Sequence, residues 1–442
     1  MRKILIFGAG RSSVTLIKYL IDNSLDNNWF VTIIDNSEDI LKKEFYNSNS
    51  AKAFCLDIQN IEKRRSYIRD SDIVVSMLPA RMHIMIARDC LDIGRHLVTA
   101  SYVSEEISRL DKEAKKKDII FLNEIGLDPG IDHMSAMKLI DDIKDSGNKL
   151  ISFKSFCGGL VHPEYDNNPW NYKFTWNPRN VVLAGNGTAK FIRNGKYKYI
   201  PYNKLFQRHE LIDILNEGSF EGYANRDSLN YRSAYGIEDI DTLFRGTLRK
   251  KGYCSSWNVF VQIGMTDDSY IIPNTCNMTY REFINMFLPY NEKLSVEEKF
   301  CQYLQIDYNS DEFKKFEWLD IFSEKRIHYK EATPAKILQS ILEEKWSMDS
   351  NDKDMIVMQH QFEYIENNNH KKLYSSLVVF GDDPIYTAMS KTVGLPVAIA
   401  VKLILNNKID LRGVCIPTDR QIYIPVLKEL SNYNINFVDR LI

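Results

Sequence analysis

Short apolar runs alternate with stretches of helical periodicity over the first 125 residues of the chain. The apolar runs have the length and the residue types of buried strands, and they span 3–7, 30–34, 53–56, 72–78, 96–100 and 119–122. Apolar residues recur at helical spacing in the intervening stretches 11–22, 60–69, 82–93 and 104–117. Strands that alternate with helices of roughly 10–15 residues predict βαβ units and a parallel sheet.

The pattern changes after Pro129. Asn194-Gly195 lies between two β-rich arms at 189–200, and this dipeptide favours a two-residue hairpin turn. Further strands are predicted at 149–157, 241–253, 354–365 and 372–381, the last two as an antiparallel pair. Helices are predicted at 279–288, 295–305 and 333–346. Thr333-Pro334 supplies the last of them with an N-cap and a proline at the first helical position.

Helix and strand alternate again from residue 385 onward. The pattern predicts a helix at 385–406, a strand near 412–416, a helix that ends at 432 and a final strand at 435–438. The chain is therefore predicted to be an α/β protein with an N-terminal doubly wound domain (1–127) and a second, mixed α+β domain (128–390). A C-terminal α/β segment (391–442) is expected to pack back on the first domain.

The composition fits this organisation. A chain of 442 residues is too long for one ordinary core, and 44% apolar with 26% charged residues is typical of globular proteins. A net charge of −2 gives no reason to expect a nucleic acid or an anionic membrane as partner. No segment approaches the roughly 18–20 apolar residues that a membrane helix needs.

The cysteines and the N-terminus indicate a cytoplasmic protein. The seven cysteines form no C-x-x-C pair and no zinc-ligand spacing, so reduced thiols and no metal site are expected. The first apolar run is too short for a signal peptide and leads directly into a glycine-rich turn.

That turn, Phe7-Gly8-Ala9-Gly10-Arg11-Ser12-Ser13, follows a predicted strand and opens a predicted helix. Gly8 permits a tight turn, and Gly10 lets the backbone approach a pyrophosphate. Ser13 stands where a third glycine would allow close packing of helix and strand, a position that a small residue can fill. The motif in this context predicts a dinucleotide site of the Rossmann type, and the alternative is a doubly wound domain whose nucleotide site is empty or remodelled.

A carboxylate at the end of the second strand bears on the cofactor. Asp35 lies 27 residues after Gly8, where an acid accepts hydrogen bonds from the ribose hydroxyls and repels a 2′-phosphate. The sequence therefore favours NAD over NADP, with NADP still possible. The other predicted cofactor contacts lie in the phosphate turn or at strand ends: Arg11, Ser12, Asn36, Asp57, Ser76, Met77 and Leu78.

Several long motifs are specific to one family. They are "NEIGLDPGIDHMSAM" (123–137), "SFCGGLVHPEYDNNPWNYKFTW" (155–176), "YANRDS" (223–228), "RGTLRKKGY" (245–253) and "TVGLPVAIAVKLIL" (392–405). Together with "GAGRSS" they closely resemble the saccharopine dehydrogenases of the L-glutamate-forming type, over most of the chain. The resemblance implies a reversible reaction of lysine metabolism, in which saccharopine, NAD(P)⁺ and water give L-glutamate, 2-aminoadipate 6-semialdehyde and NAD(P)H.

The resemblance also implies site residues. Substrate contacts fall on Ser101, Asp128, Cys157, Arg226, Thr247, Leu248 and Arg249, and nucleotide contacts extend to Ser101 and Leu127. Fungal members of the family prefer NADP and carry basic or small residues near the end of the second strand, where this chain has Asp35-Asn36.

The chemistry agrees with these assignments, although each has a structural alternative. Saccharopine has three carboxylates, which Arg226 and Arg249 would bind in bidentate fashion, unless they form surface ion pairs. Asp128 would accept a hydrogen bond from the substrate's secondary amine, or serve only as an Asx-Pro turn residue. Cys157 is assigned to the pocket lining.

The general base stays open between His133 and Lys173. A lone helix histidine is more often structural than catalytic. Lys173 belongs to "NYKFTW", interpreted as a core-facing aromatic strand.

The sequence leaves two alternative functions open. One is a related imine-reducing enzyme with a polyamine-type substrate, such as carboxynorspermidine or homospermidine synthase, which the arginines disfavour. The other is a non-catalytic NAD-binding protein. The expected partners are small-molecule substrates and a second copy of the chain, in a homodimer formed through a sheet edge of the α+β domain.

Overall fold

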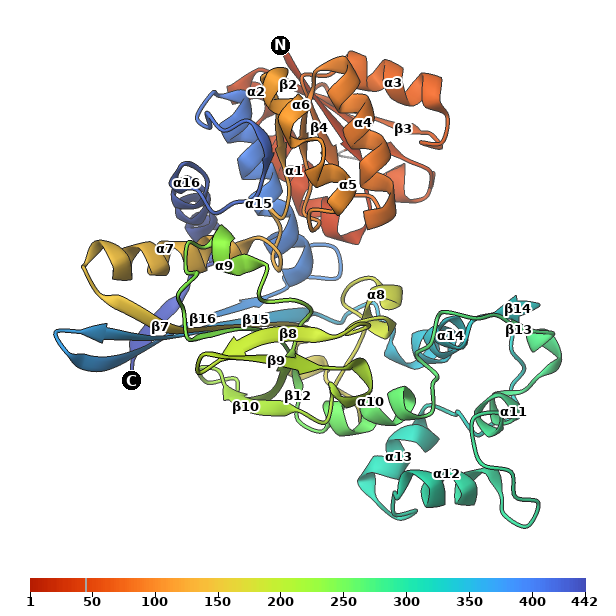
Figure 1. The fold of residues 1–442 in the computed structure, drawn as a ribbon. Coiled ribbons are helices and arrows are strands. Elements are labelled where there is room, and N and C mark those ends of the chain that lie inside the picture. Colours follow the sequence, from red (N-terminus) through yellow and green to blue (C-terminus); the bar gives the residue numbers. More distant parts are fainter. Residues whose placement is uncertain (44–45) are drawn as a thin grey trace. The chain divides into compact units, whose positions relative to one another are not determined.

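The structure is a computed structural model that describes residues 1–43 and 46–442, and these residues form sheets of seven, nine and two strands (Figure 1). The chain divides into two units. Unit 1 comprises 1–150, 364–371 and 377–440, and unit 2 comprises 151–363, 372–376 and 441–442. The α/β fold class with a second domain is confirmed.

The seven-stranded sheet of unit 1 has the order β17-β6-β5-β4-β1-β2-β3, and all of its pairings are parallel. Its strands are β1 (Arg2–Phe7), β2 (Trp29–Asp35), β3 (Ala51–Cys55), β4 (Ile73–Ser76), β5 (His96–Val98), β6 (Ile120–Leu122) and β17 (Gly413–Cys415). The six strands predicted for the first domain are all present. The order reverses at β1, which pairs with both β2 and β4, and ligands of doubly wound folds bind at such a reversal.

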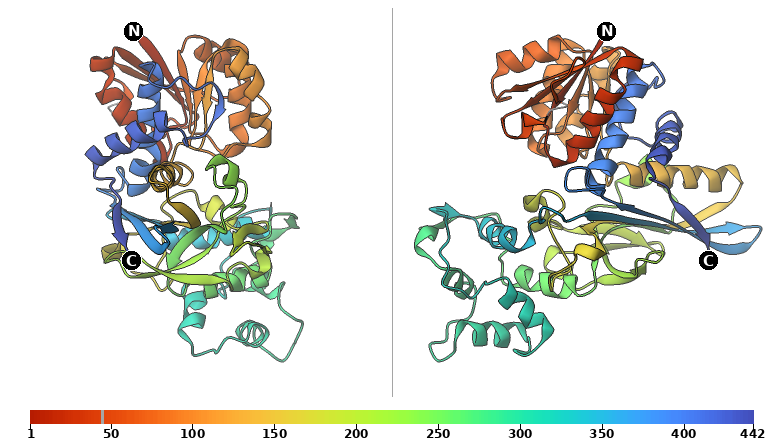
Figure 2. Two further views of the ribbon diagram at one scale, coloured as in Figure 1. Left: turned by 60° about the vertical axis from the view of Figure 1, so that its left-hand side comes forward. Right: turned by 180° about the vertical axis from the view of Figure 1, so that it is seen from behind.

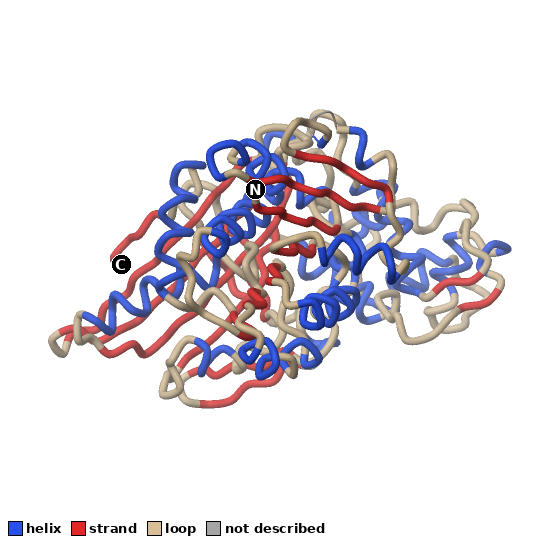
Figure 3. Tube along the Cα trace, turned by 90° about the horizontal axis from the view of Figure 1, so that it is seen from above, coloured by secondary structure: helices blue, strands red, loops and turns tan. Residues whose placement is uncertain are grey.

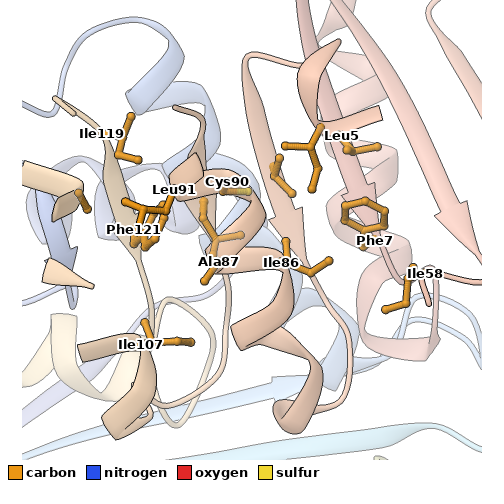
Figure 4. Close-up of a cluster of buried hydrophobic side chains, with 14 of the residues drawn as sticks. Leu5, Phe7, Ile58, Ile86, Ala87, Cys90, Leu91, Ile107, Ile119 and Phe121 are labelled. Carbon is orange, nitrogen blue, oxygen red and sulfur yellow. The ribbon is translucent and has the colours of Figure 1, made fainter. Parts of the chain in front are cut away.

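Helices cover both faces of this sheet (Figures 1 and 2). The helices of unit 1 are α1 (Val14–Asp22), α2 (Ser24–Asn27), α3 (Ile61–Arg69), α4 (His83–Ile93), α5 (Glu105–Ser108), α6 (Asp111–Lys116), α7 (Ile131–Asp145), α15 (Ala388–Leu405) and α16 (Arg420–Leu430). Of these, α7 and α16 pack against each other, and α16 also packs against α15. Figure 4 shows the apolar cluster on one face, where side chains of α4 meet side chains of β1 and β6. The single predicted helix at 104–117 is two short helices, α5 and α6.

The C-terminal segment returns to the first domain's sheet. Helix α15 packs against α1 so closely that a Cβ on Gly394 would lie 2.9 Å from the Leu16 backbone nitrogen. Ser390 Oγ lies 2.7 Å from Thr15 Oγ1, and β17 extends the sheet beside β6. The last strand is an exception: it is β18 (Val438–Leu441) instead of 435–438, and it belongs to the nine-stranded sheet.

The units do not end at the predicted domain boundaries of 127/128 and 390/391. Unit 1 extends to Leu150 because α7 packs against α16. At that contact, Tyr423 Oη donates a hydrogen bond to Asp141 Oδ2 over 2.6 Å. The GLDPG segment therefore leads into a helix of unit 1.

Helix α15 corrects one expectation. Its 18 residues have a mean hydropathy of 1.6, which is long and apolar enough for a membrane span, so the sequence does contain one such segment. In the structure 83% of this window is buried. A helix that packs on α1 and on strands β4 and β5 has the surroundings of a core helix.

The nine-stranded sheet has the order β10-β11-β12-β7-β15-β16-β18, with β8 paired to β12 and β9 paired to β8. Its other strands are β7 (Lys149–Val161), β8 (Ala189–Arg193), β9 (Lys196–Ile200), β10 (His209–Asp213), β11 (Ser219–Ala224), β12 (Thr242–Lys250), β15 (Asp354–Glu366) and β16 (Asn369–Phe380). The strands are the red segments in Figure 3, and β15 with β16 forms the predicted long hairpin. The hairpin at 189–200 is also confirmed, with positive φ at Asn194 (50°) and Gly195 (72°).

The remaining elements of unit 2 are mainly helices. They are α8 (Pro178–Val182), α9 (Tyr231–Ala234), α10 (Tyr253–Gln262), α11 (Tyr280–Asn285), α12 (Val296–Leu304), α13 (Asp311–Trp318) and α14 (Pro334–Trp346), with the short pair β13 (Ile272–Pro273) and β14 (Glu331–Ala332). The aromatic stretch at 171–176 is not the strand predicted for it. It is irregular backbone whose Tyr172 and Phe174 rings pack on Trp346.

Candidate active site

The glycine-rich turn lies between β1 and a short 3-10 segment (Arg11–Ser13) that leads into α1. Gly8 has a φ of +96°, and a Cβ there would lie 2.7 Å from the Met77 carbonyl oxygen, so only glycine fits. A Cβ on Gly10 would meet no atom within 4 Å. Ser13 is buried in the packing position. The open space at Gly10, next to an uncapped helix start, fits a pyrophosphate.

Asp35 joins the end of β2 to this turn. Its Oδ2 accepts a hydrogen bond from the Ala9 N–H over 2.8 Å, and its Oδ1 accepts one from the Ser37 N–H over 3.0 Å. Each carboxylate oxygen has a second lone pair that can accept a ribose hydroxyl. Asp35 thus supports the turn and has capacity left for a ligand.

The other predicted nucleotide contacts differ in their surroundings. Met77 and Leu78 are half-buried after β4, and Leu127 is buried. Asn36 and Asp57 are exposed. Asp57 accepts a hydrogen bond from the Gln59 N–H, so its observed bond is local and its role toward a ligand stays a prediction.

A histidine that the sequence reasoning missed connects two predicted site residues. His83 Nδ1 lies 2.8 Å from Ser76 Oγ, and His83 Nε2 lies 2.7 Å from Ser101 Oγ. Ser76 is the last residue of β4 and Ser101 follows β5, and the carboxyl ends of these adjacent parallel strands meet at one edge. The available signal was the place of His83 at the start of the helix after β4.

Burial lowers the pKa of His83 to about 4, against 6.5 for an ordinary histidine. At pH 7 the ring is neutral in the folded and the unfolded chain. As the pH falls below about 6.5, the unfolded chain takes up the proton first, so folding stability is lost until about pH 4. In urea denaturation, we expect the free energy of unfolding to fall by up to about 3 kcal/mol between pH 7 and pH 4 because of this residue. In His83→Gln the free energy of unfolding should fall by less over the same pH range.

The GLDPG segment forms a tight turn at the same edge. Gly130 has a φ of +147°, and a Cβ on it would lie 2.1 Å from the Gly126 carbonyl oxygen. Tyr102 Oη donates a hydrogen bond to Asp128 Oδ1 over 3.1 Å. The turn therefore holds Asp128, and Tyr102 is a second neighbour that the sequence reasoning missed.

Gly130→Ala is expected to reduce the free energy of unfolding by about 3 kcal/mol or more, because the backbone conformation and the contact with Gly126 both exclude a methyl group. The control is Gly147→Ala at the other end of α7. Gly147 also has a positive φ, but its Cβ would meet nothing within 4 Å, so the expected loss is about 1 kcal/mol. Equal losses in urea denaturation would contradict the steric argument.

The two candidate bases are both held by carboxylates. His133 is fully buried, with Nε2 2.9 Å from Glu124 Oε2 and Nδ1 3.6 Å from Asp132 Oδ2. In unit 2, Lys173 Nζ lies 2.6 Å from Asp352 and 3.1 Å from Asp349. An ammonium group between two carboxylates is a poor proton acceptor, which favours a structural role for Lys173.

Two neighbouring strands of unit 2 carry most of the predicted substrate contacts. Cys157 of β7 is in register with Thr247 of β12. A Cβ on Gly158 would lie 2.7 Å from the Leu248 carbonyl oxygen, so the strands approach closely here. Arg226 is exposed in the loop after β11, at a positive φ of 47°.

Arg249 has an unusual environment. It is 2% exposed, and its guanidinium carbon lies 5.0 Å from the Tyr172 ring centre and 5.4 Å from that of Tyr253. Its Nη1 donates a hydrogen bond to the Leu248 carbonyl oxygen over 2.8 Å, and its Nε has no hydrogen-bond partner in the part of the chain that the structure describes. Among the described residues no carboxylate lies within ion-pair distance, so Arg249 is not the surface ion pair considered as an alternative.

Among residues 1–43 and 46–442, no group of three or more His, Cys, Asp or Glu side chains is arranged to hold a metal ion.

Two family models cover almost the whole chain. Residues 4–122 match the saccharopine dehydrogenase NADP binding domain, and residues 126–435 match the saccharopine dehydrogenase C-terminal domain. The chain belongs to the saccharopine dehydrogenase family.

Relatives within this family cover the chain from end to end. The saccharopine dehydrogenase [NADP(+), L-glutamate-forming] of Pyricularia oryzae is 32% identical over 100% of this chain and 99% of its own length. The apo saccharopine dehydrogenase (L-Glu forming) of Saccharomyces cerevisiae has a similar structure, with a TM-score of 0.88, 30% identity and full coverage of both chains.

Longer relatives also match. The mitochondrial alpha-aminoadipic semialdehyde synthase of Rattus norvegicus is 33% identical over 99% of this chain but only 47% of its own length. The chain thus spans about half the length of this and other curated relatives of that name.

Within each unit, several of the predicted cofactor-binding and substrate-binding residues lie close together. The glycine turn, Asp35 and the end of β4 lie together, and Ser76 is linked to Ser101. Cys157 lies beside Thr247. Arg245 lies two residues from Thr247 on β12, and its guanidinium carbon is 4.4 Å from the Tyr231 ring centre.

Proposed function

We propose that the chain is an NAD(P)-dependent saccharopine dehydrogenase of the L-glutamate-forming type. It converts saccharopine, NAD(P)⁺ and water to L-glutamate, 2-aminoadipate 6-semialdehyde, NAD(P)H and a proton. The observation that carries the proposal is the similarity over full length to fungal enzymes of that name, from 31% to 32% identical over 97–99% of their chains.

The products define the bonds that change. Glutamate leaves with its amino group, so the oxidised carbon is the one on the lysine side of the secondary amine. A bound nicotinamide cofactor would supply the hydride acceptor for that carbon, and loss of the amine proton would then leave an imine. Water adds to the imine carbon, and the carbon–nitrogen bond then breaks to give the aldehyde and glutamate.

Asp128 is proposed to accept the hydrogen bond from the substrate amine. The Tyr102 hydroxyl donates a hydrogen bond to Oδ1 of this carboxylate, which supports a fixed position of Asp128 in the turn. His133 is the second candidate for proton transfer, and its bond to Glu124 would keep its ring in one orientation.

The three carboxylates of saccharopine need fixed donors. Arg226, Arg249 and Ser101 are proposed to bind them, with Cys157, Thr247 and Leu248 lining the pocket. Among the described residues, the buried guanidinium of Arg249 has no carboxylate within ion-pair distance, which supports an anionic substrate. It disfavours a polyamine substrate, which would need acidic residues there.

NAD is the proposed preferred cofactor, although the fungal relatives are named for NADP(+). The turn from Gly8 to Ser13 would bind the pyrophosphate, and Asp35 would accept the ribose hydroxyls. Its negative charge next to the turn opposes a 2′-phosphate.

The proposal includes a cytoplasmic homodimer. Strand β9 ends one branch of the nine-stranded sheet, and its Tyr197 and Tyr199 are each 56% exposed, which supports contact with a second copy at this edge.

One assay tests the reaction. Purified protein is offered saccharopine with NAD⁺ or NADP⁺, and the absorbance of the reduced nicotinamide is followed while glutamate is measured in the products. We expect turnover with both cofactors and a higher kcat/KM with NAD⁺. No turnover with either, despite binding of NADH, would refute the enzymatic function and leave the non-catalytic NAD-binding alternative.

A further inference from the structure

His83 lies between two hydroxyl groups at the carboxyl edge of the parallel sheet. Ser76 at the end of β4 is fully buried, His83 is 2% exposed, and Ser101 after β5 is half-buried. The hydrogen bonds, of 2.8 and 2.7 Å, therefore run from the core to a residue that can reach a ligand. Of these three residues, only Ser101 is partly exposed to solvent.

The ring of His83 is neutral near pH 7, because burial lowers its pKa to about 4. Its place in the first turn of α4 also disfavours a positive charge. Among the described residues, no carboxylate lies within ion-pair distance of the ring. A neutral imidazole has one donor and one acceptor nitrogen, so the two serines must take opposite roles.

The buried serine decides which nitrogen donates. Among the described residues, the Ser76 hydroxyl has one hydrogen-bond partner, Nδ1, and a buried hydroxyl without an acceptor is costly. Ser76 therefore donates to Nδ1, and the proton of the ring lies on Nε2. That proton faces two oxygen atoms, Ser101 Oγ at 2.7 Å and Thr99 Oγ1 at 3.5 Å.

The consequence concerns the hydrogen of Ser101. Because its oxygen accepts from Nε2–H, its own O–H is directed away from the ring. Its backbone N–H is also engaged, donating to Thr99 Oγ1 over 3.3 Å. Ser101 is thus presented as a hydrogen-bond donor and suits an anionic or carbonyl acceptor.

We propose that His83 is a positioning residue that fixes Ser101 as a donor toward a carboxylate of the substrate. This inference rests on the proposed function, since saccharopine supplies the carboxylate. A buried histidine with a purely structural role would affect stability and activity together. A positioning role separates the two, and the two amide substitutions of histidine can reveal the separation.

Gln and Asn each replace one nitrogen of the ring. In His83→Gln the amide nitrogen takes the place of Nε2 and can donate to Ser101, but Ser76 loses its acceptor. In His83→Asn the amide oxygen takes the place of Nδ1 and accepts from Ser76, but the bond to Ser101 is lost. We expect His83→Asn to be the more stable variant and the less active one.

The kinetic test compares these variants with Ser101→Ala. For His83→Asn we expect kcat/KM for saccharopine to fall about 10- to 100-fold, as for loss of a hydrogen bond to a charged group, mainly through KM. In His83→Gln, kcat/KM for saccharopine should stay close to the wild-type value. The double variant His83→Asn/Ser101→Ala should be no worse than Ser101→Ala alone.

His96→Gln is the matched control. His96 starts β5 at the opposite edge of the same sheet, and its Nδ1 accepts the Ile120 N–H over 3.2 Å. Its replacement should lower stability without changing kcat/KM. A Gln variant of His83 that is less active than the Asn variant, or additive effects in the double variant, would overturn the inference.

A second measurement is independent of turnover. In protein labelled with ¹⁵N-histidine, the NMR signals missing from His83→Asn belong to His83. We expect a neutral ring protonated on Nε2 at pH 7, with the Nε2 signal displaced in Ser101→Ala. A ring protonated on Nδ1, or a charged ring, would overturn the positioning role, whether or not the wild-type protein oxidises saccharopine. Absence of saccharopine oxidation would by itself refute only the proposed function.

Discussion

Asp35→Ser is expected to reverse the proposed cofactor preference, from NAD⁺ to NADP⁺. The substitution removes the carboxylate that would accept the ribose hydroxyls of NAD⁺, so kcat/KM for NAD⁺ should fall about 10- to 100-fold. It also removes the negative charge that opposes a 2′-phosphate, so kcat/KM for NADP⁺ should rise. Adding Asn36→Arg should extend the gain, because a guanidinium binds phosphate through two parallel hydrogen bonds. The measurement is the ratio of the two kcat/KM values.

Asp35 also accepts the Ala9 and Ser37 N–H groups, so a loss of binding to both cofactors must be separated from a change of preference. A damaged turn lowers both kcat/KM values and leaves their ratio unchanged. Asp39→Asn is the charge control: it removes a carboxylate from the same loop, where Asp39 is exposed and paired with Lys42. It should leave the ratio unchanged. Wild-type enzyme that prefers NADP⁺ would contradict the role assigned to Asp35.

The parallel sheet of unit 1 could be predicted because its information is local. Most of its strands are short apolar runs, and β4 and β6 are buried throughout, while each intervening helix has its own period. Strands β10 and β11 were not predicted, because polar residues such as His209 and Asp213 in β10 and Glu221 in β11 interrupt the apolar pattern. Their pairing depends on β12, a partner that a single segment does not reveal.

The expectation that no segment is long and apolar enough to span a membrane was wrong at α15, for a related reason. Lys391 lies only three residues after the start of the helix, and Lys402 lies near its end. The segment between them is nevertheless apolar, because it packs against α1 and the sheet. Hydropathy alone does not separate a core helix from a membrane span, whereas contacts within the fold do.

The glycine turn could be predicted from the sequence, since the requirement at each position is set by the backbone of the turn itself. His83 and Tyr102 could not. Their roles arise only when β4, β5 and β6 lie side by side, which brings residues 7 to 26 positions apart into hydrogen-bond distance. A lone histidine or tyrosine carries no local sign of such a partner.

Arg249 illustrates the same limit in unit 2. Its sequence neighbours, Leu248 and Lys250, suggest only a strand, and an arginine in a strand is usually at the surface. Its stacking on Tyr172, which lies 77 positions earlier in the chain, follows from the path of the irregular aromatic stretch. The resemblance named Arg249 as a substrate contact but did not indicate that the residue is buried.

Arg249→Met should lower activity without lowering stability. A buried guanidinium without a carboxylate partner is costly to desolvate, so an apolar side chain of similar length should leave the free energy of unfolding unchanged or raise it by about 1 kcal/mol. If the guanidinium binds a carboxylate of saccharopine, kcat/KM for saccharopine should fall about 10- to 100-fold. NADH binding, measured by fluorescence, should not change.

Arg64→Met is the contrasting control, because Arg64 is also buried but its Nε lies 2.7 Å from Asp89 Oδ2. Removing it leaves a buried carboxylate with a weaker set of partners, so the free energy of unfolding should fall by about 3 kcal/mol while kcat/KM stays the same. Urea denaturation and saccharopine kinetics on both variants separate the roles of the two arginines. An Arg249→Met enzyme that is as active as wild type but less stable would make the stacked guanidinium a structural residue, and the substrate carboxylates would then need other donors.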